Sequence, residues 1–179
     1  MRAVPSTTRG RVAVVFGVLV VLGAGATARL FVWPLTDRPV HVDAVVALGG
    51  DPGQRRAHQA LALASAGFAP VAVISLGGRR PVPCPRGDGR EKVICFRANP
   101  LNTRGEAEHV AALAARRHWG RIIVVSERSQ ATRARLLFAR CTADRVVMVP
   151  VADPGWHILY DVAYEWGALF KALVIHRSC

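Results

Sequence analysis

The chain has 179 residues, of which 51% are hydrophobic, and this length and composition suit one domain plus a short extra segment. Its 24 Lys and Arg outnumber its 12 Asp and Glu, giving a net charge of +12. Such basicity allows nucleic acid or an anionic membrane surface as a partner. The arginines are scattered without interleaved aromatic residues, and no helix-turn-helix, zinc-finger or RNP-like pattern occurs, so we expect no nucleic-acid binding.

The first predicted element is an apolar segment behind a basic N-terminus. Arg2, Arg9 and Arg11 precede the uncharged stretch Val12–Ala28, and Leu30–Trp33 extends it towards the length of a membrane-spanning helix. Because basic flanks stay in the cytoplasm, we expect a single-pass anchor in the cell membrane with a cytoplasmic N-terminus.

A cleaved signal peptide and a buried core helix are the alternatives for this segment. Ala26-Thr27-Ala28 fits the small-x-small rule of a cleavage site. The anchor and the signal peptide would both export the domain. We therefore divide the chain into residues 1–33, a cytoplasmic tip with the membrane segment, and residues 34–179, an extracytoplasmic α/β domain.

A continuous apolar run, Val42–Leu48, is typical of a strand buried on both faces of a parallel sheet. It exits through Gly49-Gly50-Asp51, where glycine permits a tight turn and close approach to a ligand. A helix is expected over Gly53–Ala66 with Gly67 as its stop, and its free N–H groups could hold an anion. The alternative is a tight turn in which Asp51 caps the helix.

The next predicted strand, Val71–Leu76, includes Ser75 and also leads into two glycines, Gly77-Gly78. A loop that merely needs a positive φ is the alternative to a ligand-binding role. Residues 77–92 lack periodicity and are predicted to form a surface loop, followed by a short strand, Val93–Phe96.

A clear helix is predicted over Thr103–His118. Asn102 or Thr103 can cap it, and Thr103 with Glu106 three residues later predicts a capping box. Capping is one interpretation. The other uses the amide of Asn102 and the hydroxyl of Thr103 in a site at the sheet edge.

The strand Arg121–Val125 leads into the densest polar cluster, Ser126–Arg135, where a helix is expected over Ser129–Arg140. Arg133 and Arg135 lie about 200° apart around that helix, so only one is expected to face the sheet edge. An arginine there offers a planar fork for phosphate or carboxylate, and we assign this role to Arg133. Arg135 is expected on a solvated face.

A strand over Arg145–Val149 and an amphipathic helix over Trp156–Val174 complete the predicted elements. Strands that alternate with helices imply a three-layer α/β/α Rossmann-like domain with a mostly parallel sheet, preceded by one N-terminal transmembrane helix. In such sheets ligands bind beyond the carboxyl ends of the strands, which is where the polar loops fall.

Four cysteines, Cys84, Cys95, Cys141 and Cys179, are consistent with export and allow three disulfide connectivities. Cys84 and Cys95 flank one polar loop, so we favour Cys84–Cys95 with Cys141–Cys179. Four reduced thiols are the alternative. The six histidines are dispersed without ligand spacing, and we expect no metal site; no cofactor is indicated.

Four motifs in this order resemble the YdcF-like family of bacterial envelope proteins, which includes SanA-like and ElyC-like members. They are Leu48-Gly49-Gly50-Asp51 with Arg56 and Ala60-Leu61, Ser75-Leu76-Gly77-Gly78, Asn102-Thr103-Arg104-Gly105-Glu106, and Ser126–Ala134. The resemblance implies an exported Rossmann-like domain with a binding pocket. The family's Tyr-His is Ser129-Gln130 here, and glutamine does not titrate, so binding is implied more strongly than catalysis.

We therefore expect a membrane-anchored envelope protein that binds a small anionic or nucleotide-like ligand, with a role in cell-envelope biogenesis. The alternative is a non-catalytic structural or partner-binding factor with a degraded pocket. The sequence does not decide whether a reaction is catalysed, but Asp51 and Glu106 are the candidate acid or base groups. The predicted ligand-binding residues are Gly49, Gly50, Asp51, Arg56, Ser75, Gly77, Gly78, Asn102, Thr103, Glu106, Ser126, Gln130 and Arg133.

Overall fold

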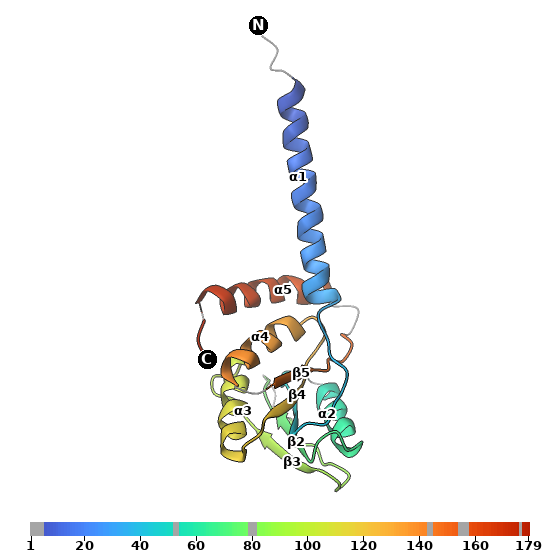
Figure 1. The fold of residues 1–179 in the computed structure, drawn as a ribbon, viewed down its shortest axis with the longest axis vertical. Helices are drawn as coiled ribbons and strands as arrows, with labels where there is room; N and C mark the ends of the chain where they lie inside the picture. Colours follow the sequence, from blue (N-terminus) through green and yellow to red (C-terminus); the bar gives the residue numbers. More distant parts are fainter. Residues whose placement is uncertain (1–5, 52–53, 79–81, 143–144, 154–157, 176) are drawn as a thin grey trace.

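The computed structural model describes residues 6–51, 54–78, 82–142, 145–153, 158–175 and 177–179. A long N-terminal helix projects from an α/β domain (Figure 1). The helical elements are α1 (Ser6–Thr27), η1 (Ala28–Val32), α2 (Arg55–Ser65), α3 (Thr103–Arg117), α4 (Ala131–Cys141), α5 (Ile158–Phe170) and η2 (Lys171–Ile175), where η denotes a short π-helix. The strands are β1 (Ala44–Ala47), β2 (Val71–Ser75), β3 (Lys92–Phe96), β4 (Arg121–Val125) and β5 (Arg145–Met148).

The five strands form one sheet in the order β3-β2-β1-β4-β5, and every neighbouring pair is parallel. Val45 of β1 lies opposite Ala72 of β2 on one side and Ile123 of β4 on the other. The chain builds outward from β1 to β3 and then crosses back to β4, so the strand order reverses between β1 and β4. In open parallel sheets this reversal is where a ligand crevice forms.

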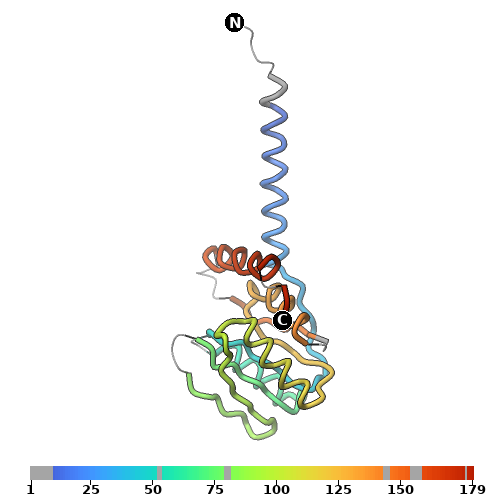
Figure 2. Tube along the Cα trace, turned by 90° about the vertical axis from the view of Figure 1, so that its left-hand side faces the viewer, coloured from blue at the N-terminus to red at the C-terminus, as the bar shows by residue number. Residues whose placement is uncertain are grey.

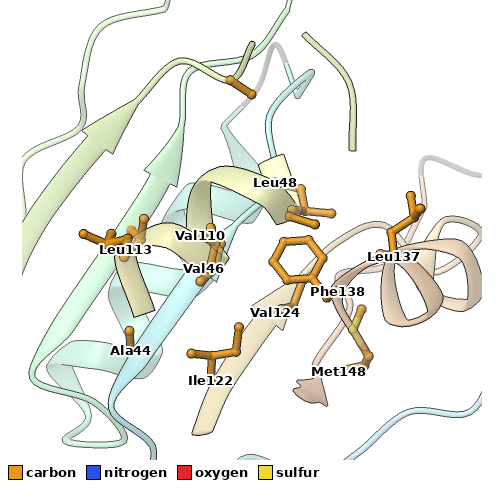
Figure 3. Packing of buried hydrophobic residues seen from close by; sticks show 14 of the residues in the cluster. Ala44, Val46, Leu48, Val110, Leu113, Ile122, Val124, Leu137, Phe138 and Met148 are labelled. Atoms are coloured by element: carbon orange, nitrogen blue, oxygen red, sulfur yellow. The ribbon is translucent and has the colours of Figure 1, made fainter. Parts of the chain in front are cut away.

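Both faces of the sheet are covered, which confirms the predicted three-layer fold. On one face, Val46 and Leu48 pack with α3 and α4, and Figure 3 shows the ring of Phe138 beside Leu48 and Val124. On the other face, Val45 and Ala47 pack against α2. Alternate residues of β1 thus enter different cores, and all four are buried.

Most predicted boundaries agree with the structure to within a few residues. Gly67 ends α2 with φ +88°, as its position predicted. Gly53, the predicted start of that helix, and Trp156, the predicted start of the last one, lie outside the described residues. The last predicted helix is divided into α5 and the π-helical η2.

The N-terminal helix extends farther than the uncharged stretch of the sequence. Gly10–Val32 is 23 residues long with a mean hydropathy of 2.1, which is apolar enough to cross a membrane. Arg29 is accommodated because its Nη1 donates to the carbonyl oxygen of Trp33. Phe31, within η1, is fully buried in the domain.

Both predicted disulfides are present. Cys84 is bonded to Cys95 and Cys141 to Cys179, with Cα–Cα separations of 5.9 Å and 4.8 Å. The first closes the loop that joins β2 to β3. The second ties the C-terminus to the end of α4. Two disulfides favour an oxidising, extracytoplasmic location for the domain.

Candidate functional site

A cavity of about 580 Å³ lies beyond the carboxyl ends of the central strands. The exit loops of β1 and β2, the N-termini of α3 and α4, and one side of α5 enclose it. Ten of the predicted ligand-binding residues line it, although they come from four separate segments of the sequence. They are Gly49, Gly50, Arg56, Gly77, Gly78, Asn102, Thr103, Glu106, Gln130 and Arg133.

The two glycine loops contact one another through their backbones. A Cβ atom on Gly49 would lie 2.5 Å from the nitrogen of Gly77, and Gly50 has φ +82°, so both positions require glycine. Their N–H groups are already used, because Gly49 donates to Glu106 and Gly50 to the carbonyl oxygen of Gly77. Neither N–H group is therefore available to a ligand, and those of Gly77 and Gly78 remain candidates.

Glu106 is buried beside these loops and accepts the Gly49 N–H at 2.7 Å. Burial raises the pKa of its carboxyl above the usual 4.5, while the Ser75 hydroxyl, the Gly49 N–H and the charges of Arg56 and Arg133 oppose the rise. The predicted capping box of Thr103 with Glu106 is wrong, because this carboxyl accepts from Gly49 in the loop after β1 instead.

The cap of α3 is Asn102. Its side-chain oxygen accepts the Gly105 N–H at 2.9 Å, and its backbone is extended. Gly105 is needed because a Cβ there would lie 2.1 Å from the oxygen of Pro100. The side-chain oxygen of Asn102 is thus used in capping α3. The hydroxyl of Thr103 is not needed for the cap and instead accepts from Arg133 of α4.

Asp51 holds the start of α2. Its Oδ2 accepts the backbone N–H of Arg56 at 2.8 Å and lies 3.8 Å from the Nε of the same residue, and Arg55 lies 3.9 Å from Oδ1. This arrangement agrees with the capping alternative. Both ion pairs that Asp51 forms in the described chain are with α2, and neither is with Arg133.

Gln130 connects the two arginines of the cavity. Its Oε1 accepts from Arg56 Nη1 at 3.0 Å, and its Nε2 donates to Thr103 Oγ1 at 3.1 Å. The same hydroxyl accepts from Arg133 Nη1 at 2.9 Å. An amide suits this position because it accepts from a cation on one side and donates on the other.

Arg133 faces the cavity and the Thr103 hydroxyl, as predicted, but its carboxylate partner is Glu165 of α5. Nε and Nη2 donate to the two carboxylate oxygens, each at 2.7 Å, and both side chains are buried. Burial alone would lower the pKa of Arg133, but Glu165 outweighs it and the pKa is raised. Arg133 therefore stays protonated and is neutralised within the protein.

Three predicted site residues do not line this cavity. Asp51 and Ser75 lie behind the glycine loops, where they line a much smaller cavity. Ser126 is fully buried, and its hydroxyl donates to the carbonyl oxygen of Glu127.

Sequence reasoning missed seven residues that line the cavity: Leu101, Glu127, Ser129, Tyr160, Asp161, Tyr164 and Glu165. Four of them come from α5, which was predicted only as an amphipathic helix. Asp161 and Glu165, four residues apart on one face of this helix, were the sequence signal that could have indicated its role in the cavity. Around the rim, burial raises the pKa of Glu127, whose Oε1 accepts from Arg55 at 3.0 Å.

Comparisons of the chain with protein-family models, with curated proteins and with solved structures find no match. Within the described ranges, no three His, Cys, Asp or Glu side chains are grouped closely enough to hold a metal ion. The cavity has a buried, arginine-containing floor and a rim of tyrosines and carboxylates. Such an arrangement can bind an anion whose remaining part reaches the rim.

Proposed function

We propose that this protein is anchored to the cell membrane by α1 and binds a small anionic ligand in the cavity on its extracytoplasmic side. The order of the glycine and helix-start motifs supports the further proposal that it is a YdcF-like envelope protein. The length and hydropathy of Gly10–Val32 support the anchor, and the two disulfides support export of the domain.

The charge of Arg56 carries the ligand proposal. Its side chain is 3% exposed, and within the described chain its Nε donates no hydrogen bond. Its ion-pair partner, Asp51, is 3.8 Å away, whereas Arg133 has two 2.7 Å bonds to Glu165. Arg56 also lines the cavity, so its positive charge, which has the more distant carboxylate of the two, is the one closer to uncompensated.

Glu106 supports an anion at the same place. A raised pKa keeps the carboxyl closer to its neutral form, which reduces repulsion of a negative ligand. The phosphate or carboxylate group of a small molecule would therefore meet Arg56, Glu106 and the Gly77-Gly78 loop together. We propose binding and assign no reaction.

The alternative function, a partner-binding factor, was expected to have a degraded pocket. The cavity instead retains a connected hydrogen-bond network from Arg56 through Gln130 and Thr103 to Arg133. An intact network of this kind favours ligand binding over a scaffold that has lost its site.

The test uses the full-length protein in detergent micelles with inorganic pyrophosphate as the probe. We expect millimolar pyrophosphate to raise the melting temperature, since a ligand that binds only the folded state stabilises it. Arg56→Gln should lose this response. Arg116→Gln, at an exposed position on α3, removes the same charge and should keep it. Equal responses from both variants would show only general screening of the basic chain and contradict the proposal.

A further inference from the structure

The polarity of α5 is reversed relative to an ordinary surface helix. Its two acidic residues point inward, where Glu165 pairs with Arg133 and Asp161 lines the cavity. The outward side is apolar and extends into η2. Its large residues are 40–85% exposed: Leu159, Tyr160, Tyr164, Trp166, Phe170, Leu173, Val174 and Ile175. A helix surrounded by water normally has its polar side outward, so this face calls for an apolar cover.

This face lies at the end of the apolar helix α1. The ring of Phe31 packs edge-on against that of Trp166, with 5.2 Å between the ring centroids. Trp166 Nε1 donates to Thr27 Oγ1 at 3.2 Å. In Figure 1 and Figure 2, turned by 90°, α5 runs across the axis of α1. Because α4 lies between α5 and the sheet, the apolar face of α5 points to the side on which α1 extends.

We propose that the outward face of α5 and η2 lies in the interfacial layer of the same bilayer that α1 crosses. This rests on the proposed anchor. A helix that runs across the axis of a spanning segment lies along the membrane surface. Tyrosine and tryptophan favour the headgroup level, and three of these rings lie on α5. The exposed Lys171, together with the net charge of +12, suits anionic lipids.

The position of α5 also determines where the cavity lies. Tyr160 and Tyr164 belong both to the outward face and to the cavity rim. When the outward face is immersed in the headgroup layer, the rim lies beside that layer as well. The part of the rim formed by these two tyrosines is thus placed at the membrane surface.

The experiment places a fluorescent label on single introduced cysteines in the full-length protein, reconstituted as one copy per phosphatidylcholine–phosphatidylglycerol nanodisc. Ala163→Cys labels the outward face of α5, and Ala115→Cys labels an exposed position on α3. Val18→Cys labels the middle of α1. Each label is challenged with iodide in water and with spin-labelled lipids.

We expect the label at position 163 to be several-fold less accessible to iodide than the label at position 115, and to be quenched by spin-labelled lipids. Iodide access equal to that at position 115 would overturn the proposal. So would protection from iodide without lipid quenching, which would indicate that another part of the same chain covers the face. Lipid quenching at position 18 separates the proposed anchor from the proposed position of α5. If the label at position 18 is quenched by lipid while the label at position 163 stays in water, the position of α5 is refuted and the anchor stands. If position 18 also escapes lipid quenching, both are refuted.

Discussion

Arg133 of α4 and Glu165 of α5 form a buried, two-pronged ion pair in which both carboxylate oxygens accept from the guanidinium at 2.7 Å. This pair joins the cavity to the helix that faces the membrane in our proposal. It also fixes the roles of the cavity arginines. Arg133 is structural in the first instance, and Arg56 is the arginine that we propose to meet the ligand.

Arg133→Ala should destabilise the domain by about 3–5 kcal/mol, because it leaves the Glu165 carboxylate buried without a partner. Urea unfolding of the full-length protein in micelles, followed by circular dichroism, measures this loss. Arg135→Ala is the matched control on the same helix. Its pair with Asp37 is partly exposed and should cost less than about 1 kcal/mol. Equal losses in the two variants would contradict the structural role of Arg133.

Glu106 should make stability depend on pH. Burial raises its pKa above 4.5, so the folded state holds this proton more tightly than the unfolded chain does. Its contribution is complete below pH 4.5 and is lost as the pH rises through the folded-state pKa. Glu106→Gln keeps the acceptor for Gly49 and removes this dependence. The stability difference between wild type and variant should therefore shift in favour of the variant as pH rises, and a constant difference would refute the assignment.

Gly49→Ala should lower stability by about 1–3 kcal/mol, the range for forcing atoms into a packed region. The added methyl group would meet the backbone of Gly77 at 2.5 Å, so the two loops would have to separate. Gly120→Ala is the control, because a Cβ there meets nothing within 4 Å. Because Gly49 lines the cavity, we also expect pyrophosphate to stabilise Gly49→Ala less than it stabilises the wild type. Thermal melts with and without the probe measure both effects.

Both disulfides should be formed in the exported protein. Denaturation without reductant should leave all four cysteines unmodified by a thiol reagent, and mass spectrometry would count the labels. Removing Cys141–Cys179, which spans 38 residues, should cost about 4 kcal/mol by loop entropy, against about 3 kcal/mol for Cys84–Cys95, which spans 11. Free thiols in protein isolated from the envelope would contradict this prediction.

The anchor should have its N-terminus in the cytoplasm, because Arg9 and Arg11 flank the apolar segment on that side. A reporter active only outside the cytoplasm should work when fused after Cys179, and a reporter active only inside should fail. The opposite result would also refute the extracytoplasmic location that we propose for the domain.

The sequence by itself determined the elements and their order. Apolar runs such as Val42–Leu48 identify buried parallel strands, and alternation with helices leaves few topologies because crossovers are right-handed. Because parallel strands end at the same edge of a sheet, the sequence also predicted that the loops after β1, β2 and β4 would meet there. Arg121–Val125 matches its strand residue for residue. These features follow from local periodicity and chain connectivity, both of which can be read directly from the sequence.

Only the tertiary structure decided which groups pair. Five acidic residues lie in or beside the cavity, and choosing the partners of its arginines among them depends on distances and burial that spacing does not encode. They are Asp51, Glu106, Glu127, Asp161 and Glu165. The reversed polarity of α5 is a second case. Its pattern predicts an amphipathic helix, but which side faces the domain was fixed by the pairing of Glu165 with Arg133. The buried guanidinium of Arg133 stabilises the Glu165 carboxylate and so keeps the acidic side of α5 inward. The apolar side then faces outward, where an apolar cover removes it from water.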